Sequence, residues 1–324
     1  MNSSLRFWLI FSFTIVIFIT ITTLFIFISN QQSIDKLEAS IDILQNTRIA
    51  LLETNRIKED IFISELINPD FYEKKYSLQE RKLDVYFNRT YKLLSKLKVS
   101  GLTNEQRSEI VLIEGKLSKY KTTFKHLIQL FKYKGYKDYG IEGKMRDYVH
   151  EITNYNDPQI KLYSLLLRKH EKDFLIRKEL FYISSFNNVT HQLIQYVYSN
   201  PRLIESEKNR LLNLVYFYNK YFKIIARVEH KIGVKSKQGL LNLSSNQFEE
   251  LHSDLDNIES KLSVEELVAK NELKTKSIFI FASITLFLFI IVAALTNIIT
   301  RSVSNITQTF SNYINSGFTH IPNG

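Results

Sequence analysis

The chain of 324 residues contains no cysteine, only four prolines and only nine glycines. Without cysteine it can form no disulfide, no thiolate metal site and no cysteine nucleophile, and the redox state of its compartment stays open. So little glycine and proline leaves few residues for the tight turns of β-hairpins, whereas Leu, Lys, Glu and Gln recur at helical spacing. The composition therefore predicts an all-α protein.

Two long apolar runs, Phe7–Ser29 and Ile278–Thr300, contain no charged residue. A helix needs about 20 apolar residues to cross a bilayer, because each residue adds about 1.5 Å. The first run exceeds the apolar part of a signal peptide, and no small-x-small cleavage site follows it, which favours an uncleaved anchor. We predict a cytoplasmic N-terminus 1–6, transmembrane helices 7–29 and 278–300, an extracytoplasmic domain 30–276 and a cytoplasmic segment 301–324.

Flanking charges alone leave the membrane orientation open. Arg6 before the first run favours an inside N-terminus, whereas the lysines at 270, 274 and 276 precede the second run and only Arg301 follows it. The formal net charge is +10, and most basic residues lie between the runs, interspersed with Glu and Asp. We interpret them as a solvated helix face with a bias toward anionic ligands or the membrane surface, and we predict no nucleic-acid binding.

Between the apolar runs the sequence is a succession of amphipathic helices. Asn-Pro or Asp-Pro pairs mark helix boundaries at Pro69, Pro158 and Pro201. The first helix is expected to continue from the apolar run to about Leu66. Further helices are expected at about 78–99, 104–133, 143–153 and 158–187. They are followed by a helix that ends at about 199, one at about 203–231, and a last one from about 245 into the second run. Such long helices predict a tall bundle whose neighbours share an axis.

An internal repeat links two parts of this region. Tyr120, Phe124 and Lys125 recur at one fixed offset as Tyr218, Phe222 and Lys223. The same offset places Gly135 on Gly233, and one further residue of slippage places Gly140 on Gly239. Chance similarity in a chain rich in Lys, Tyr and Phe is the alternative. If the repeat is real, it implies two helical modules with one core each.

The most distinctive segment is LLLRKHEKDFLIR, Leu165–Arg177, whose titratable residues include Arg168, His170, Glu171, Lys172, Asp173 and Arg177. An apolar stripe at helical spacing comprises Ile160, Tyr163, Leu167, Phe174 and Phe181. Glu171 falls in a polar gap of this stripe, where an unpaired charge would be very costly, so we expect Arg168, Lys172 or Arg177 beside it. We favour a buried ion pair that fixes the helix register, with part of a ligand pocket as the alternative.

Together with GIEGKMRDYVHEI (Gly140–Ile152) and IGVKSKQGLL (Ile232–Leu241), this segment resembles the helical bimodular sensor domain of bacterial chemoreceptors and sensor histidine kinases. The resemblance covers roughly residues 30–276. It implies two stacked four-helix bundles that share long helices, and the binding of small anions such as organic acids. It also implies pocket arginines on the first helix, for which Arg48 and Arg56 are the positions by location, since an arginine fork binds a carboxylate with two hydrogen bonds. The alternative is that both arginines are solvated or pair with the glutamates at 53 or 59.

After the second apolar run, Ile299–Phe318 resembles the first helix of a HAMP linker. Its heptad-like seam comprises Val303, Ile306, Phe310 and Ile314. Gly317 falls where that helix usually ends, whereas Ser302 stands where the family commonly has proline. The alternative is an ordinary juxtamembrane helix.

Sequence patterns of enzymes are lacking. There is no G-x-S-x-G, P-loop or H-E-x-x-H motif, and the seven histidines do not cluster at metal-ligand spacing. His150–Asn154 resembles the phospho-acceptor box of histidine kinases, but it lies between the apolar runs, and we assign it to the sensor domain. We predict no catalytic residue, no metal and no cofactor in this chain.

These features predict a non-enzymatic receptor input module in the bacterial inner membrane. The expected partners are a second copy of the chain, a small anionic ligand, the membrane, and a downstream kinase or the chemotaxis machinery. The signal would pass through the second apolar helix to the HAMP-like segment. The alternative is a two-pass membrane scaffold that binds no small molecule.

Overall fold

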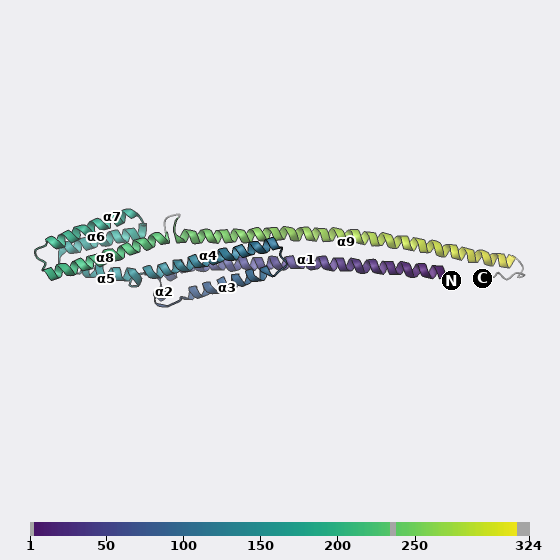
Figure 1. Cartoon of the computed structure of the whole chain (residues 1–324), viewed down its shortest axis with the longest axis horizontal. Helices are drawn as coiled ribbons and strands as arrows, with labels where there is room; N and C mark the ends of the chain where they lie inside the picture. Colours follow the sequence, from purple (N-terminus) through teal and green to yellow (C-terminus); the bar gives the residue numbers. More distant parts are fainter. Residues whose placement is uncertain (1–2, 234–237, 316–324) are drawn as a thin grey trace. The chain divides into compact units, whose positions relative to one another are not determined.

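The computed structural model describes residues 3–233 and 238–315, and within these ranges it contains helices and no strand (Figure 1). The prediction of an all-α chain is therefore confirmed for the described residues. Contacts divide the chain into two compact units, one formed by Met1–Ala39 with Lys261–Gly324 and the other by Ser40–Ser260.

The first unit contains the apolar parts of helices α1 (Ser3–Ile63) and α9 (Leu240–Asn315). The most apolar window of α1 has a mean hydropathy of 2.2 and that of α9 has 3.0, and no residue of either window is buried. Both helices are therefore long and apolar enough to span a membrane. Beside the apolar segments, Lys270 Nζ of α9 lies 2.6 Å from Glu38 Oε1 of α1.

The segment that resembles a HAMP helix belongs to the same unit. Val303, Ile306, Phe310 and Ile314 all lie on α9 with exposed side chains. Gly317 and Phe318, as well as residues 1–2 of the expected N-terminal segment, lie outside the described residues. The resemblance to a HAMP linker stays a prediction.

The second unit contains the remaining helices and the inner parts of α1 and α9. Its further elements are η1 (Glu65–Ile67), α2 (Pro69–Glu73), α3 (Leu78–Lys98), α4 (Asn104–Lys134), α5 (Gly140–Thr153), α6 (Pro158–Arg177), α7 (Leu180–Ser199) and α8 (Glu205–Ile232). The start of α4 follows from its sequence, because Thr103 and Gln106 form a capping box. At α6, Pro158 occupies the first turn while the Asp157 carboxylate accepts two backbone N–H groups.

The sequence predicted one helix from Pro158 to about residue 187, and this prediction is wrong. Lys178 has φ 58° and so takes the left-handed conformation that ends α6, without a glycine or proline to mark the break. A new helix, α7, begins at Leu180. The break leaves Phe181 69% exposed, so it does not continue the apolar stripe, and Phe186 is fully buried instead.

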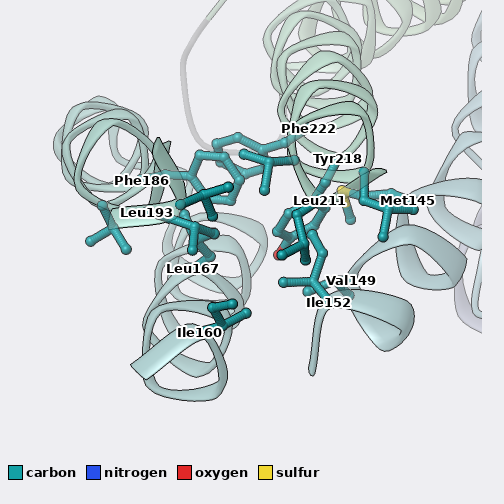
Figure 2. Close-up of a cluster of buried hydrophobic side chains, with 14 of the residues drawn as sticks. Met145, Val149, Ile152, Ile160, Leu167, Phe186, Leu193, Leu211, Tyr218 and Phe222 are labelled. Atoms are coloured by element: carbon teal, nitrogen blue, oxygen red, sulfur yellow. The ribbon is translucent and has the colours of Figure 1, made fainter. Parts of the chain in front are cut away.

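Helices α5, α6, α7 and α8 surround one apolar core, and we call them the α5–α8 group (Figure 2). Phe222 of α8 lies at its centre, with its ring centroid 4.0 Å from that of Phe186 and 5.6 Å from that of Phe174. Met145 and Val149 of α5 point into the same core.

The inner parts of α1 and α9 pack with α3 and α4, and we call them the α1/α3/α4/α9 group. Aromatic contacts connect its helices. Tyr120 of α4 lies 5.7 Å from Phe87 of α3 and 6.2 Å from Phe248 of α9, measured between ring centroids. Phe62 at the end of α1 lies 5.9 Å from Phe124 of α4. The fully buried Tyr120 and Phe124 are therefore the centre of this group.

The repeated positions have the same structural role in α4 and α8. Tyr120 and Phe124 are fully buried on α4, as Tyr218 and Phe222 are on α8. Helix α4 ends at Gly135 with φ 85° and helix α8 at Gly233 with φ 82°, a region that favours glycine. A Cβ atom on the first glycine would lie 2.7 Å from the Cα of Gly140, and one on the second 2.8 Å from the Cα of Gly239. The two glycines of each pair therefore allow a close backbone approach where one helix group connects to the other.

Candidate functional site

Arg48 of α1 faces two carboxylates of α9. Its Nη1 donates to Asp256 Oδ1 at 3.0 Å and lies 3.2 Å from Glu259 Oε2. The hydrogen bond to Asp256 and the charge of Glu259 raise the pKa of Arg48. Gln45, one turn earlier, also donates to Glu259, at 3.1 Å. In this arrangement one guanidinium nitrogen of Arg48 connects α1 to α9.

Arg56 lies two turns further along α1 and has a different environment. Its side chain is 70% exposed, and its Nε lies 3.4 Å from Glu53 Oε2 on the same helix. The two arginines therefore have different partners, and they do not contact the same carboxylate. The ligand-binding role of Arg48 and Arg56 stays a prediction.

Glu171 lies in the α5–α8 group and is only 7% exposed. Its Oε2 accepts a hydrogen bond of 2.5 Å from the hydroxyl of the fully buried Tyr218. Burial raises the pKa of Glu171, while the hydrogen bond from Tyr218 and the charges of Arg168 and Lys172 oppose that rise. The expected direct cationic partner is therefore replaced by a phenol. The hydrogen bond that the phenol donates stabilises the ionised carboxylate and so works against the effect of burial.

The other charged residues of Leu165–Arg177 lie around this buried pair. His170 is half-buried, and its Nδ1 atom has no hydrogen-bond partner among the described residues. Lys172 is exposed. Arg177 Nε lies 4.0 Å from Asp173 Oδ1, and its Nη1 donates to the hydroxyl of Tyr182 on α7 at 2.8 Å. The end of the motif thus connects α6 to α7 across the left-handed break.

The sequence did not predict a second buried carboxylate, Glu229 of α8. It is 4% exposed, and its Oε1 lies 3.1 Å from Lys134 Nζ at the end of α4 and 2.8 Å from Lys178 Nζ at the end of α6. Burial lowers the pKa of Lys178, and Glu229 opposes that shift. Because α4 belongs to one helix group and α6 and α8 belong to the other, this ion-pair cluster connects the two groups.

A third glutamate, Glu142 of α5, lies close to this cluster. Burial raises its pKa, while the charge of Lys134 opposes the rise and that of Glu229 adds to it. The residues that could have indicated the cluster are Lys134 and Glu229, because each precedes a repeated glycine by one turn or less. Their contact with one another, however, is not visible in the sequence.

The described residues contain no group of three His, Asp or Glu side chains that could hold a metal ion. His150, which resembles a phospho-acceptor histidine, lies exposed on α5 within the second unit. The buried cluster of Glu229, Lys134 and Lys178 places charged groups at the junction of the two helix groups. Neither a known protein family nor a curated protein matches the chain.

Proposed function

We propose that this chain is the input module of a bacterial transmembrane receptor. The chain lies in the inner membrane, and its helical domain, residues 30–276, is on the extracytoplasmic side, where it binds a small anionic ligand. The apolar segment of α9 carries the signal inward. The proposal includes no enzymatic activity in this chain. It follows the sequence resemblance to the bimodular sensor domains and to a HAMP helix.

One observation supports the proposal most. Helices α1 and α9 each contain an apolar segment of membrane-spanning length and also a segment that packs in the helical domain. A helix is stiff along its axis because each turn is hydrogen-bonded to the next. A ligand that favours one arrangement of the packed segments therefore displaces the apolar segments of the same helices.

The arrangement of helices supports two stacked four-helix bundles. The α5–α8 group and the α1/α3/α4/α9 group each have an aromatic centre, and the glycine pairs 135/140 and 233/239 lie at the two connections between the groups. Two such chains, side by side as a parallel homodimer, would present the exposed seam of Val303, Ile306, Phe310 and Ile314 to one another. A downstream kinase or chemotaxis signalling domain would receive the displacement.

The membrane topology can be tested with single cysteines, because the native chain has none. The variants are Lys161→Cys, on the exposed face of α6, and Ser304→Cys, beyond the second apolar run. A membrane-impermeant maleimide added to spheroplasts should label the first variant, and should label the second only after the membrane is permeabilised. Labelling of both variants in intact spheroplasts, or of neither, would contradict the proposed topology.

A two-pass scaffold is the second candidate, and one observation favours it. Ile176, Leu180 and Phe181 around the α6–α7 break are 75%, 72% and 69% exposed, which suits contact with a partner protein. If a partner binds there in the cell, Phe181→Cys would be protected from the maleimide, and adding Leu180→Asp would restore labelling. Full labelling of Phe181→Cys in cells would remove the support for this candidate.

A further inference from the structure

A cavity of about 400 Å³ lies between the start of α3 and the second half of α4, and neither Arg48 nor a residue of the Glu229 cluster lines it. Its lining residues are Lys75, Tyr76, Glu80, Leu83, Asp84, Lys125, Ile128, Gln129 and Lys132. The volume lies within the range of about 300–1,000 Å³ that is typical of small-molecule sites. Of these residues, only Lys125 belongs to the internal repeat, and none of them was predicted to bind a ligand.

Lys132 is fully engaged in structural contacts. Its Nζ donates to Glu80 Oε2 at 2.7 Å and to the backbone oxygens of Lys74 and Lys75 at 3.4 and 3.3 Å. An ammonium group has three N–H donors, so these three acceptors use them all. Glu80 in turn caps α3 by accepting the backbone N–H of Ser77 at 2.7 Å. Lys132 and Glu80 are therefore the rigid end of the cavity.

The other two lysines are more available. Lys125 is half-exposed and lies 3.0 Å from Asp84 Oδ1. Lys121 also approaches Asp84, at 3.5 Å, but does not line the cavity, and its ammonium lies over the ring of Phe87. Lys75 is exposed, and its Nζ lies over the ring of Tyr76, 5.7 Å from the centroid. Lys75 and Lys125 can both turn their ammonium groups toward a ligand.

The lining carries three lysines and two carboxylates, which leaves one positive charge in excess. One negative charge on a ligand would balance it. A second negative charge would meet the repulsion of Glu80 and Asp84, which line the same cavity. The charge balance of this cavity therefore favours a monoanion.

The remaining lining residues favour an apolar body on that ligand. Leu83 and Ile128 are 2% and 5% exposed and make an apolar floor, and the half-exposed ring of Tyr76 makes a wall. The amide of Gln129 adds a donor beside the lysines. A cationic rim above an apolar floor suits a carboxylate attached to a small aromatic or branched aliphatic group.

We propose that this cavity binds a small monocarboxylate with an apolar body, through Lys75, Lys125 and Gln129. The inference rests on the proposed function, in that the domain senses a small anion. It narrows the ligand class, because compact di- and tricarboxylates carry more charge than the lining can balance.

The test measures binding to the full chain in detergent micelles by calorimetry, with three matched probes. Benzoate carries one carboxylate on a ring, phthalate carries two, and benzyl alcohol carries none. Benzoate should bind saturably. Phthalate and benzyl alcohol should each bind at least about tenfold more weakly than benzoate. Equal affinity for benzoate and phthalate would overturn the inference, as would the absence of saturable benzoate binding to folded protein.

Variants assign the binding to this cavity. Lys75→Gln and Lys125→Gln should each weaken benzoate binding about tenfold, whereas the matched control Lys161→Gln, exposed on α6, should not change it. Asp84→Asn removes one negative charge from the lining, so it should raise the affinity for phthalate relative to benzoate. Benzoate binding that both lysine variants retain would overturn the assignment. The receptor proposal would survive either failure, because the cysteine labelling tests it independently.

Discussion

The two helix groups of the second unit both have a buried aromatic centre, but they differ in the ion pairs that join their helices. The α5–α8 group is centred on a cluster of aromatic rings, in which Phe186 stacks on Phe222 and meets Tyr218 edge to face, and all three are fully buried. In the α1/α3/α4/α9 group, ion pairs between helices accompany a buried aromatic centre. Lys98 lies 2.7 Å from Glu114, and Lys116 lies 2.6 Å from Asp254 and 2.7 Å from Glu250.

This difference has a mechanical consequence. Deleting a buried aromatic ring costs several kcal/mol, because it leaves a cavity. A partly exposed ion pair contributes about 0–1 kcal/mol and can exchange partners with water. The helices that continue into the apolar segments, α1 and α9, are joined by such a pair, Arg48 with Asp256, which is cheap to rearrange. We expect the aromatic core of the α5–α8 group to resist rearrangement more than these surface contacts do.

The largest effect is expected for Phe222→Ala, which removes the centre of the aromatic stack. The free energy of unfolding of the full chain in detergent should fall by about 3–5 kcal/mol. Denaturant titration followed by circular dichroism measures it. Phe222→Leu keeps most of the apolar volume and should cost clearly less. A loss below about 1 kcal/mol for Phe222→Ala would contradict the expectation that the aromatic core of the α5–α8 group is the more strongly stabilised one.

An intermediate effect on stability is expected for Glu171→Gln, which changes a buried carboxyl group of the α5–α8 group. Because burial raises its folded-state pKa above the ordinary value of 4.5, its stabilising contribution is fully present below about pH 4.5 and is lost as pH rises through the folded pKa. Wild type should therefore gain stability relative to Glu171→Gln as pH falls from 7 toward 4.5.

Thermal unfolding of both proteins across this pH range measures the difference. Glutamine keeps an oxygen that can accept the hydrogen bond from Tyr218, so the comparison isolates the proton. Glu179→Gln, at an exposed position before α7, serves as the control and should show no such trend. A constant difference between wild type and Glu171→Gln would contradict the prediction.

The smallest effect is expected for Arg48→Gln, although it breaks the contact between α1 and α9. The side chains of Arg48 and Asp256 are 36% and 42% exposed, so the loss of stability should be about 0–1 kcal/mol and should shrink at high salt. Arg56→Gln, at a more exposed arginine, should cost still less. A loss of about 3 kcal/mol or more for Arg48→Gln would mean that this contact is as rigid as the aromatic core.

Local signals predicted much of the helix pattern. The capping box at Thr103, the proline at 158 and the glycines at 135 and 233 all mark observed helix ends, because each acts on backbone groups within one turn. The break at Lys178 carried no such signal. Lysine has no preference for the left-handed conformation, so the surrounding packing, including the ion pair with Glu229, holds it there.

The sequence by itself determined the all-α class, the two apolar helices and the equivalent glycine pairs, since these depend on residues close together along the chain. Only the tertiary structure decided which partners the charged residues have. Tyr218 lies 47 positions from Glu171, and Asp256 lies 208 positions from Arg48. A charge can be satisfied by any suitable group that folding brings near it, whereas helical periodicity depends on neighbours within a few residues. For that reason the buried cluster at Glu229 and the lysine cavity beside α3 emerged only from the fold.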